Sequence, residues 1–499
     1  MIESSLKELS KALADKKISS VELTQLYLDR MASLNHSLNA FITPTPEFAL
    51  EVARRADEYR AKNNGHRLLG IPMANKDNLL INGQRTTCGS RMLGDFIAPY
   101  TSHVVESILS AGMVPLGKLN MDEFAMGSSN QTSYFGVVRN PWDLTRVPGG
   151  SSGGSAAAVS ARLSPIATAS DTGGSIRQPA SFTNTCGLKP TYGLVSRYGV
   201  IAFASSLDQV GALGRSVEDV ALFMEVIAGH DSRDSTSLSQ PVASYVAALE
   251  TLANTSHSGG RSLEGLRIGL PKEMFVEKGI DAPIWAALEE AKATFSRLGA
   301  TLIPISLPHI SHSVAVYYVI APAEAFSNLA RYDGVRYGYR TPEYADLQEM
   351  YTKSRAEGFG EEVKRRIMIG TYMLTEESFN IYYIQAQKVR RLITDDFNRV
   401  FTECDVLLGP STPITAFEIG SVAMEDPLQM YLNDIFTIPA NLTGMPALSI
   451  PCGFTEQGLP IGMQLMGPLL SEELLFKVGH AYQQVTQWHQ QAPNISVQH

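Results

Sequence analysis

Apolar positions near the N-terminus follow a helical spacing. Two segments, Ser5–Glu8 and Ser19–Glu22, place a Glu three residues after a Ser, which is typical of a capping box at a helix N-terminus. The second segment is followed by a set of apolar residues that would share one helix face: Val21, Leu23, Leu26, Leu28 and Met31. We therefore predict that residues 1–60 form a helical segment that packs on the rest of the chain.

Beyond residue 60 the pattern changes to short apolar runs separated by Gly and Pro, which are typical of buried strands in an α/β sheet. The predicted strands are residues 70–74, 113–116, 163–168, 267–270, 406–409, 447–450 and 461–465. A Gly-containing turn between the last two predicts a hairpin. Helices are expected between strands, for example at 286–298 and 360–374. The pattern predicts one large α/β domain over residues 61–495, a mixed sheet flanked by helices, with a surface excursion at 230–262.

Composition and charge exclude several classes of function. The chain has a formal charge of −9 and no basic tract. Because affinity for nucleic acids rests mainly on phosphate neutralisation, the chain by itself is a poor candidate for nucleic-acid binding. No segment approaches the roughly 18 consecutive apolar residues of a membrane-spanning helix, and the N-terminus lacks the order of a secretion signal. The four cysteines, Cys88, Cys186, Cys404 and Cys452, show no C-x-x-C spacing. We expect reduced, structural cysteines, no metal site, no membrane association and a cytoplasmic location.

Residues 149–155 and 171–175 are rich in Gly and Ser, yet both lie tightly between apolar runs. A flexible linker would have the same composition but not that setting. Glycine allows several backbone N–H groups to converge on one point, and such a group of donors stabilises a developing oxyanion. The four successive amides of Thr172, Gly173, Gly174 and Ser175 are therefore predicted to form an oxyanion hole beside a hydroxyl nucleophile.

Three familiar motifs match this chain in letters only. Residues 149–153 fit G-x-S-x-G, but that motif requires a preceding strand, and the residues before it read as a loop. Residues 171–173 resemble an aspartic-protease loop, but such an enzyme needs two of them. Residues 112–118 fit G-x-x-x-x-G-K, but Leu119 stands where a phosphate-binding loop needs Ser or Thr. We reject all three interpretations.

The ordered set of these segments resembles the amidase signature family. The segments are residues 70–77 (GIPMANKD), 149–155 (GGSSGGS), 171–180 (DTGGSIRQPA) and 187–191 (GLKPT). The resemblance implies that Ser175 is the nucleophile, that Ser151 follows a cis peptide bond and relays a proton, and that Lys76 is the general base. This chemistry is reasonable, because a serine needs a base and burial favours the neutral form of lysine.

Within that family, the chain resembles the glutaminase subunits of tRNA-dependent amidotransferases over essentially its whole length. The more specific segments are residues 120–129, 196–199, 204–209 and 361–370. Such a protein hydrolyses glutamine to glutamate and ammonia through a glutamyl-serine intermediate. The resemblance implies that a partner subunit uses this ammonia to amidate Glu-tRNA(Gln) or Asp-tRNA(Asn). The implied partners are the B and C subunits, with aminoacyl-tRNA, ATP and Mg bound through the partner and no cofactor in this chain.

The same resemblance assigns a pocket for free glutamine. Arg366 corresponds to the residue that binds the α-carboxylate, and Asp434 to the residue that binds the α-amino group. Tyr317 corresponds to the pocket wall, and Ser128 also lies at the substrate. Each of these residues could instead be an ordinary surface or core-edge residue.

Two alternatives to this assignment stay open. The adjacent Arg365 and Tyr318 could take the places assigned to Arg366 and Tyr317. The protein could also be a free-standing amidase acting on small or aryl amides, for which a wholly apolar pocket is expected. A catalytically silent scaffold is a third interpretation, against which the complete set of Lys76, Ser151 and Ser175 argues.

Overall fold

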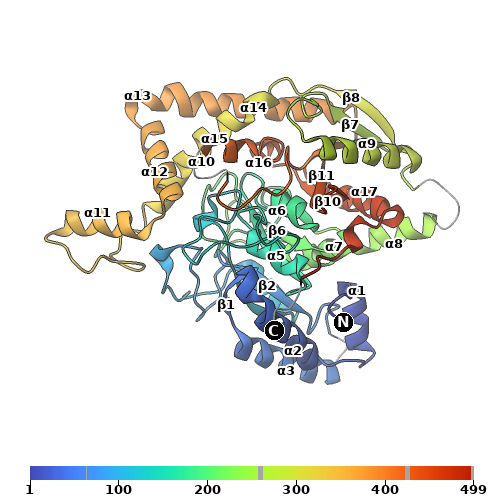
Figure 1. Cartoon of the computed structure of the whole chain (residues 1–499), viewed down its shortest axis with the longest axis horizontal. Helices are drawn as coiled ribbons and strands as arrows, with labels where there is room; N and C mark the ends of the chain where they lie inside the picture. Colours follow the sequence, from blue (N-terminus) through green and yellow to red (C-terminus); the bar gives the residue numbers. More distant parts are fainter. Residues whose placement is uncertain (63–64, 257–261, 422–426, 496–499) are drawn as a thin grey trace.

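A mixed sheet of eleven strands forms the centre of the part of the chain that the structure describes, with helices packed around it (Figure 1). This computed structural model describes residues 1–62, 65–256, 262–421 and 427–495. The strands lie in the order β1-β3-β2-β4-β6-β5-β10-β11-β9-β7-β8. Their bounds are β1 Phe41–Pro44, β2 Pro72–Lys76, β3 Val114–Leu119, β4 Ile166–Asp171, β5 Cys186–Lys189, β6 Gln209–Gly214, β7 Arg267–Pro271, β8 Thr301–Ile305, β9 Val406–Pro410, β10 Ala447–Phe454 and β11 Pro460–Met466.

The helices come mostly between strands, as the sequence predicts. They are α1 Leu6–Ala14, α2 Ser20–Leu38, α3 Pro46–Lys62, α4 His103–Ser110, α5 Gly153–Ser160, α6 Arg177–Thr183, α7 Val217–Ile227, α8 Tyr245–Ser256, α9 Ala282–Arg297, α10 Ser313–Leu329, α11 Leu347–Gly358, α12 Glu361–Met373, α13 Glu376–Ser378, α14 Ile384–Val400, α15 Pro427–Leu432, α16 Ile438–Thr443 and α17 Glu472–Val485. One short π-helical segment, Phe379–Tyr383, links α13 to α14.

Every predicted strand overlaps an observed one, and the predicted hairpin is the antiparallel pair of β10 and β11. The central strands β5 and β6 were not predicted. Their glycines explain why: a Cβ on Gly211 would lie 2.0 Å from the carbonyl oxygen of Leu188 on the neighbouring strand. The close approach of the two strand backbones thus requires Gly at positions where a recognisable strand pattern would have a branched apolar residue.

The N-terminal segment forms the predicted helices, and Ser5 and Ser19 both make complete capping boxes. Two details differ from the prediction. The short strand β1 lies between α2 and α3, where it pairs with β3, and Leu26 is 38% exposed while Tyr27 is fully buried. The buried face of α2 is therefore centred on Tyr27, because the orientation of this helix is set by the sheet that it covers.

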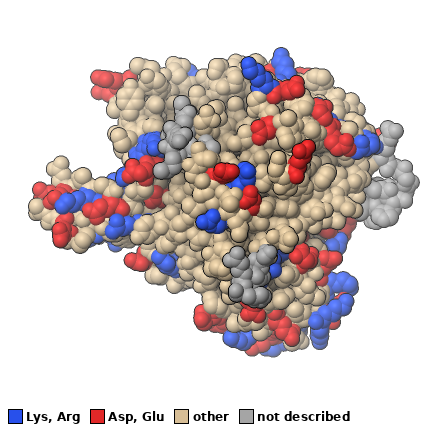
Figure 2. Space-filling model, viewed as in Figure 1, with Lys and Arg blue, Asp and Glu red and all other residues tan. Residues whose placement is uncertain are grey.

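Within residues 230–262, the predicted surface excursion, the structure contains α8, whose Tyr245, Val246 and Leu249 are buried; residues 257–261 lie outside the described part. The four cysteines are buried and unpaired. Among the described helices, none combines the length and apolar character required to cross a membrane. Lysine, arginine and acidic side chains are interspersed on the face in Figure 2, with no continuous basic stripe.

The sheet brings the two Gly-Ser segments together. Strands β2 and β4 are parallel neighbours, so their carboxyl ends, Lys76 and Asp171, lie at the same edge of the sheet. Residues 149–152 run directly into the start of α5, and residues 172–176 connect β4 to α6. This edge is therefore where the candidate catalytic residues are placed.

Candidate active site

Lys76 is fully buried at the end of β2. Its Nζ lies 2.8 Å from Ser151 Oγ, 2.8 Å from Ser152 Oγ and 2.9 Å from Ser170 Oγ. No ion pair to Lys76 occurs among the described residues. Burial is the main reason that its pKa falls to about 7, although nearby acidic groups oppose the shift. A lysine with this pKa is partly neutral near pH 7 and can accept a proton.

Ser151 and Ser175 lie next to this amine. The peptide bond between Gly150 and Ser151 is cis, as the resemblance implies, and Ser151 is fully buried. The backbone N–H of Ser152 donates to the carbonyl oxygen of Ser175 over 3.2 Å, which ties the two Gly-Ser segments together. Ser175 is 7% exposed, and its hydroxyl makes no hydrogen bond within the described ranges. Of the predicted relay, the structure thus contains the Lys76–Ser151 contact, and no Ser151–Ser175 hydrogen bond occurs among the described residues.

Hydrogen bonds hold the loop from Thr172 to Ser175 through its oxygen atoms, whereas its backbone N–H groups have no partner among the described residues. Thr172 Oγ1 donates to Asp208 over 2.7 Å, and Thr437 Oγ1 donates to the carbonyl oxygen of Gly173 over 2.7 Å. Gly174 has a φ of +141°, and a Cβ there would lie 2.2 Å from Thr437 Oγ1. The four amides find no acceptor in the described part of the chain, so they are available to an oxyanion.

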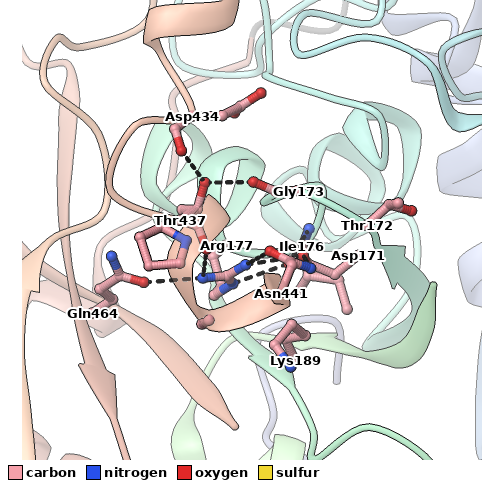
Figure 3. Close-up of polar contacts among 12 residues, drawn as sticks. Asp171, Thr172, Gly173, Ile176, Arg177, Lys189, Asp434, Thr437, Asn441 and Gln464 are labelled. Carbon is pink, nitrogen blue, oxygen red and sulfur yellow. Dashed lines mark hydrogen bonds and ion pairs between the residues drawn. The ribbon is translucent and has the colours of Figure 1, made fainter. Parts of the chain in front are cut away.

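A buried arginine connects this loop to the segment that carries Asp434 (Figure 3). Arg177 donates to both carboxylate oxygens of Asp171, at 3.1 and 3.0 Å. It also donates to the carbonyl oxygen of Thr437 over 2.8 Å and to Asn441 over 2.6 Å. Burial alone would raise the pKa of Asp171, but Arg177 holds it at about 2. These contacts fix residues 437–441 against the loop of residues 172–175.

Asp434 presents one unpaired carboxylate oxygen in a buried place. The hydroxyl of Ser128 donates to its Oδ2, whereas Oδ1 is buried without a partner among the described residues. Burial raises the pKa of Asp434 to about 7. A buried carboxylate oxygen without a donor is costly, and an ammonium group of a ligand would satisfy it.

Arg366 supplies the opposite charge. It is 2% exposed, and its Nε donates to Glu362 over 2.8 Å from the same helix, α12. Tyr317 is also buried, and its phenol ring lies within 3.0 Å of the position of a Cβ on Gly173. The charges of Arg366 and Asp434 both shift the pKa of the Tyr317 phenol. The predicted pocket residues are therefore grouped beside the nucleophile loop.

Arg365 and Tyr318, the sequence neighbours of the assigned pocket residues, lie in different surroundings from Arg366 and Tyr317. The Arg365 side chain is 44% exposed and pairs with Oε2 of Glu362, whereas the Arg366 side chain is 3% exposed and pairs with Oε1 of the same carboxylate. The Tyr318 ring stacks on Tyr431 with ring centroids 3.9 Å apart. Burial and contact with Gly173 thus favour Arg366 and Tyr317 as the pocket residues.

Other residues at this site were not singled out by the sequence analysis. They are Ser152, Ser170, Asp208, Thr437 and Asn441. Ser152, Asp208 and Ser170 lie in or beside segments that carry the resemblance, so the signal was their proximity to those motifs. Thr437 and Asn441 gave no local signal, because they reach the loop only through the fold.

The protein-family model described as Amidase matches residues 22–476 of this chain. The chain belongs to the amidase family. The A subunit of glutamyl-tRNA(Gln) amidotransferase from Dechloromonas aromatica (strain RCB) is 58% identical to it over 99% of each chain.

Two solved structures of the amidase family show how general the fold is. A crystal structure of the A subunit of glutamyl-tRNA(Gln) amidotransferase from Thermotoga maritima has a TM-score of 0.79 and 41% identity, covering 97% of this chain and 96% of that one. The native peptide amidase from Stenotrophomonas maltophilia has a TM-score of 0.80 and 29% identity, covering 97% of both chains. The fold alone therefore does not identify the substrate, which has to be inferred from the residues of the pocket.

For an amidase with this site we expect activity to fall as the medium becomes acidic. Lys76 accepts a proton only when neutral, and its neutral fraction rises as the pH increases through its pKa of about 7. The kcat/KM for an uncharged amide should therefore fall about tenfold per pH unit below pH 7 and level off above it. For glutamine the fall should be steeper, because Asp434 also loses its charge near pH 7. Initial rates from pH 5 to 9 test this, and a flat profile would contradict a lysine base.

Proposed function

We propose that this protein is the glutaminase subunit of a glutamyl-tRNA(Gln) amidotransferase. The observation that carries the proposal is the pair of buried, opposite charges, Arg366 and the unpaired Oδ1 of Asp434, beside the loop of Ser175. A free amino acid carries a carboxylate and an ammonium group at a fixed separation. A site that buries both must supply counter-charges, because burying an unpaired charge is costly. A wholly apolar pocket would have favoured a general amidase.

The geometry suggests the following reaction. Neutral Lys76 takes the proton of Ser151 while Ser151 takes that of Ser175, and Ser175 Oγ attacks the side-chain carbonyl carbon of glutamine. The amides of residues 172–175 stabilise the resulting oxyanion. The C–N bond breaks, the proton returns through Ser151 to the leaving nitrogen, and ammonia departs. Water then hydrolyses the glutamyl ester by the same proton route, which releases glutamate and restores the Ser175 hydroxyl.

The remaining steps are assigned to partners. We propose that the B and C subunits complete the enzyme and that the B subunit binds aminoacyl-tRNA, ATP and Mg in a cytoplasmic complex. Among the described residues, no group of three or more His, Cys, Asp or Glu side chains is placed to hold a metal ion. The formal net charge of −9 supports tRNA binding elsewhere in the complex.

We expect the isolated chain to be unable to amidate charged tRNA. Formation of Gln-tRNA(Gln) should require the two partner subunits, ATP and Mg, because ammonia alone does not activate the glutamyl carboxylate. The experiment measures glutamine hydrolysis and amidated tRNA for the chain alone, then with B and C subunits and Glu-tRNA(Gln), and in parallel with Asp-tRNA(Asn). Full amidation by the chain alone would contradict the proposal, as would an absence of glutamine hydrolysis in the assembled complex.

A further inference from the structure

A small cavity is lined in part by Ser170, whose hydroxyl lies 2.9 Å from Nζ of Lys76. Its volume is about 10 Å³, at the lower end of the roughly 10–15 Å³ that one water molecule needs. Its polar lining consists of Asn78, Ser170, Thr172, Arg197, Asp208 and Gln209. In Figure 3 the side chain of Thr172 extends away from the Arg177 cluster.

Two polar atoms of the cavity lining have no hydrogen-bond partner among the described residues. One is Oδ1 of Asn78, a residue that is 2% exposed, and the other is Nε of Arg197, which lies 3.9 Å from Asp234 Oδ2, within ion-pair range but beyond hydrogen-bond distance. Oδ1 is an acceptor and Nε is a donor. A water molecule that donates to the first and accepts from the second would satisfy both, and buried waters typically make about three such bonds. The cavity therefore has the size and the chemistry of a water site.

The hydrogen bonds around Lys76 give this site a function. A neutral lysine amine has two N–H donors and one lone pair, and three hydroxyl groups surround it. Ser152 Oγ donates a hydrogen bond to the carbonyl oxygen of Ser170 over 3.1 Å, so it accepts a hydrogen bond from an N–H of Lys76. The lone pair can then accept from either Ser151 or Ser170. The relay works only if it accepts from Ser151.

In that arrangement Ser170 must direct its own proton elsewhere. Ser170 Oγ accepts from Lys76 over 2.9 Å and from Nδ2 of Asn78 over 3.0 Å. Its own O–H must therefore be directed at a third group, and Ser170 lines the cavity. A water there would accept a hydrogen bond from this O–H and donate one to Asn78 Oδ1. Ser170 would then no longer compete with Ser151 for the lysine lone pair.

We propose that one ordered water molecule occupies this cavity, and that Asn78, Ser170 and this water keep the lone pair of Lys76 directed at Ser151. Asn78 and Ser170 are thus positioning residues that act through Lys76. The inference rests on the proposed role of Lys76 as the base, and it adds to the proposed function a proton-orienting site outside the glutamine pocket.

The test compares Asn78→Ala, Ser170→Ala and the double variant. In Asn78→Ala, Ser170 is free to donate to Lys76, so kcat should fall roughly tenfold, a fraction of the ~10²–10⁴-fold typical of acid–base catalysis. The KM for glutamine should not change. Removing the competing hydroxyl as well should restore part of the loss, so the double variant should be faster than Asn78→Ala. Ser164→Ala is the matched control, since Ser164 is equally buried and its hydroxyl donates to the carbonyl oxygen of Ile166.

Two further measurements separate this inference from the proposed function. The rate at which a fluorophosphonate modifies Ser175 depends on the base but not on glutamine recognition, and it should show the same order of variants. A high-resolution crystal structure of the wild type should contain water bonded to Asn78 in the cavity. A double variant that is slower than Asn78→Ala, or a cavity without water, would overturn the inference. Absent glutamine hydrolysis with normal fluorophosphonate modification would instead refute the proposed function.

Discussion

Replacing Ser175 by Ala is expected to abolish the glutamyl-enzyme and to slow glutamine hydrolysis by on the order of 10⁶-fold, because the covalent route is lost. Ser151→Ala should leave slower but measurable turnover, reduced by roughly 10²–10⁴-fold, because it removes proton transfer and keeps the nucleophile. The measurement combines single-turnover kinetics with mass spectrometry of the acyl-enzyme trapped by acid quenching.

Ser152→Ala is the comparison for Ser151→Ala, because both serines lie 2.8 Å from Lys76 Nζ. If only the relay matters, Ser152→Ala should be the milder change. An acyl group found on Ser151 of the wild type would reverse the assignment of nucleophile and relay. Equal losses for the two variants would indicate that both serines serve to hold Lys76 in place.

Glutamine selectivity is expected to reside in Arg366 and Asp434. Asp434→Asn keeps the size of the side chain and an acceptor for Ser128, but it removes the charge that would face the substrate ammonium. Losing one partner of a buried charge pair costs about 2–5 kcal/mol, which corresponds to a fall of at least roughly 30-fold in kcat/KM for glutamine. Arg366→Lys should raise the KM for glutamine, because lysine lacks the two parallel donors that match a carboxylate.

The deciding assay compares kcat/KM for glutamine with that for an uncharged primary amide in each variant. Only the value for glutamine should fall. Arg365→Lys is the control, since the Arg365 side chain is 44% exposed beside the same Glu362, and it should behave as the wild type. If both substrates react more slowly, these residues support the fold or the relay. If neither does, the pocket lies elsewhere and the general-amidase alternative gains.

Much of the sheet could be predicted from the apolar pattern, because strands such as β9 and β11 are continuous runs of buried residues. The pattern failed at β5 and β6, where glycines replace branched residues so that backbones can approach closely. It also placed Leu26 in the buried face of α2, where Tyr27 is the buried residue. Spacing along a helix defines an apolar stripe, but the rotation of that stripe depends on what it packs against.

The sequence by itself indicated the amidase family and, through the ordered motifs that carry that resemblance, predicted Lys76, Ser151 and Ser175 as the catalytic residues. Only the tertiary structure decided how these groups are charged and aimed. Burial of Lys76 sets its pKa near 7, and an unpaired oxygen on Asp434 is created by segments far apart in the chain. The physical reason is that desolvation and hydrogen-bond partners depend on what surrounds a side chain in space, which no local pattern of residues encodes.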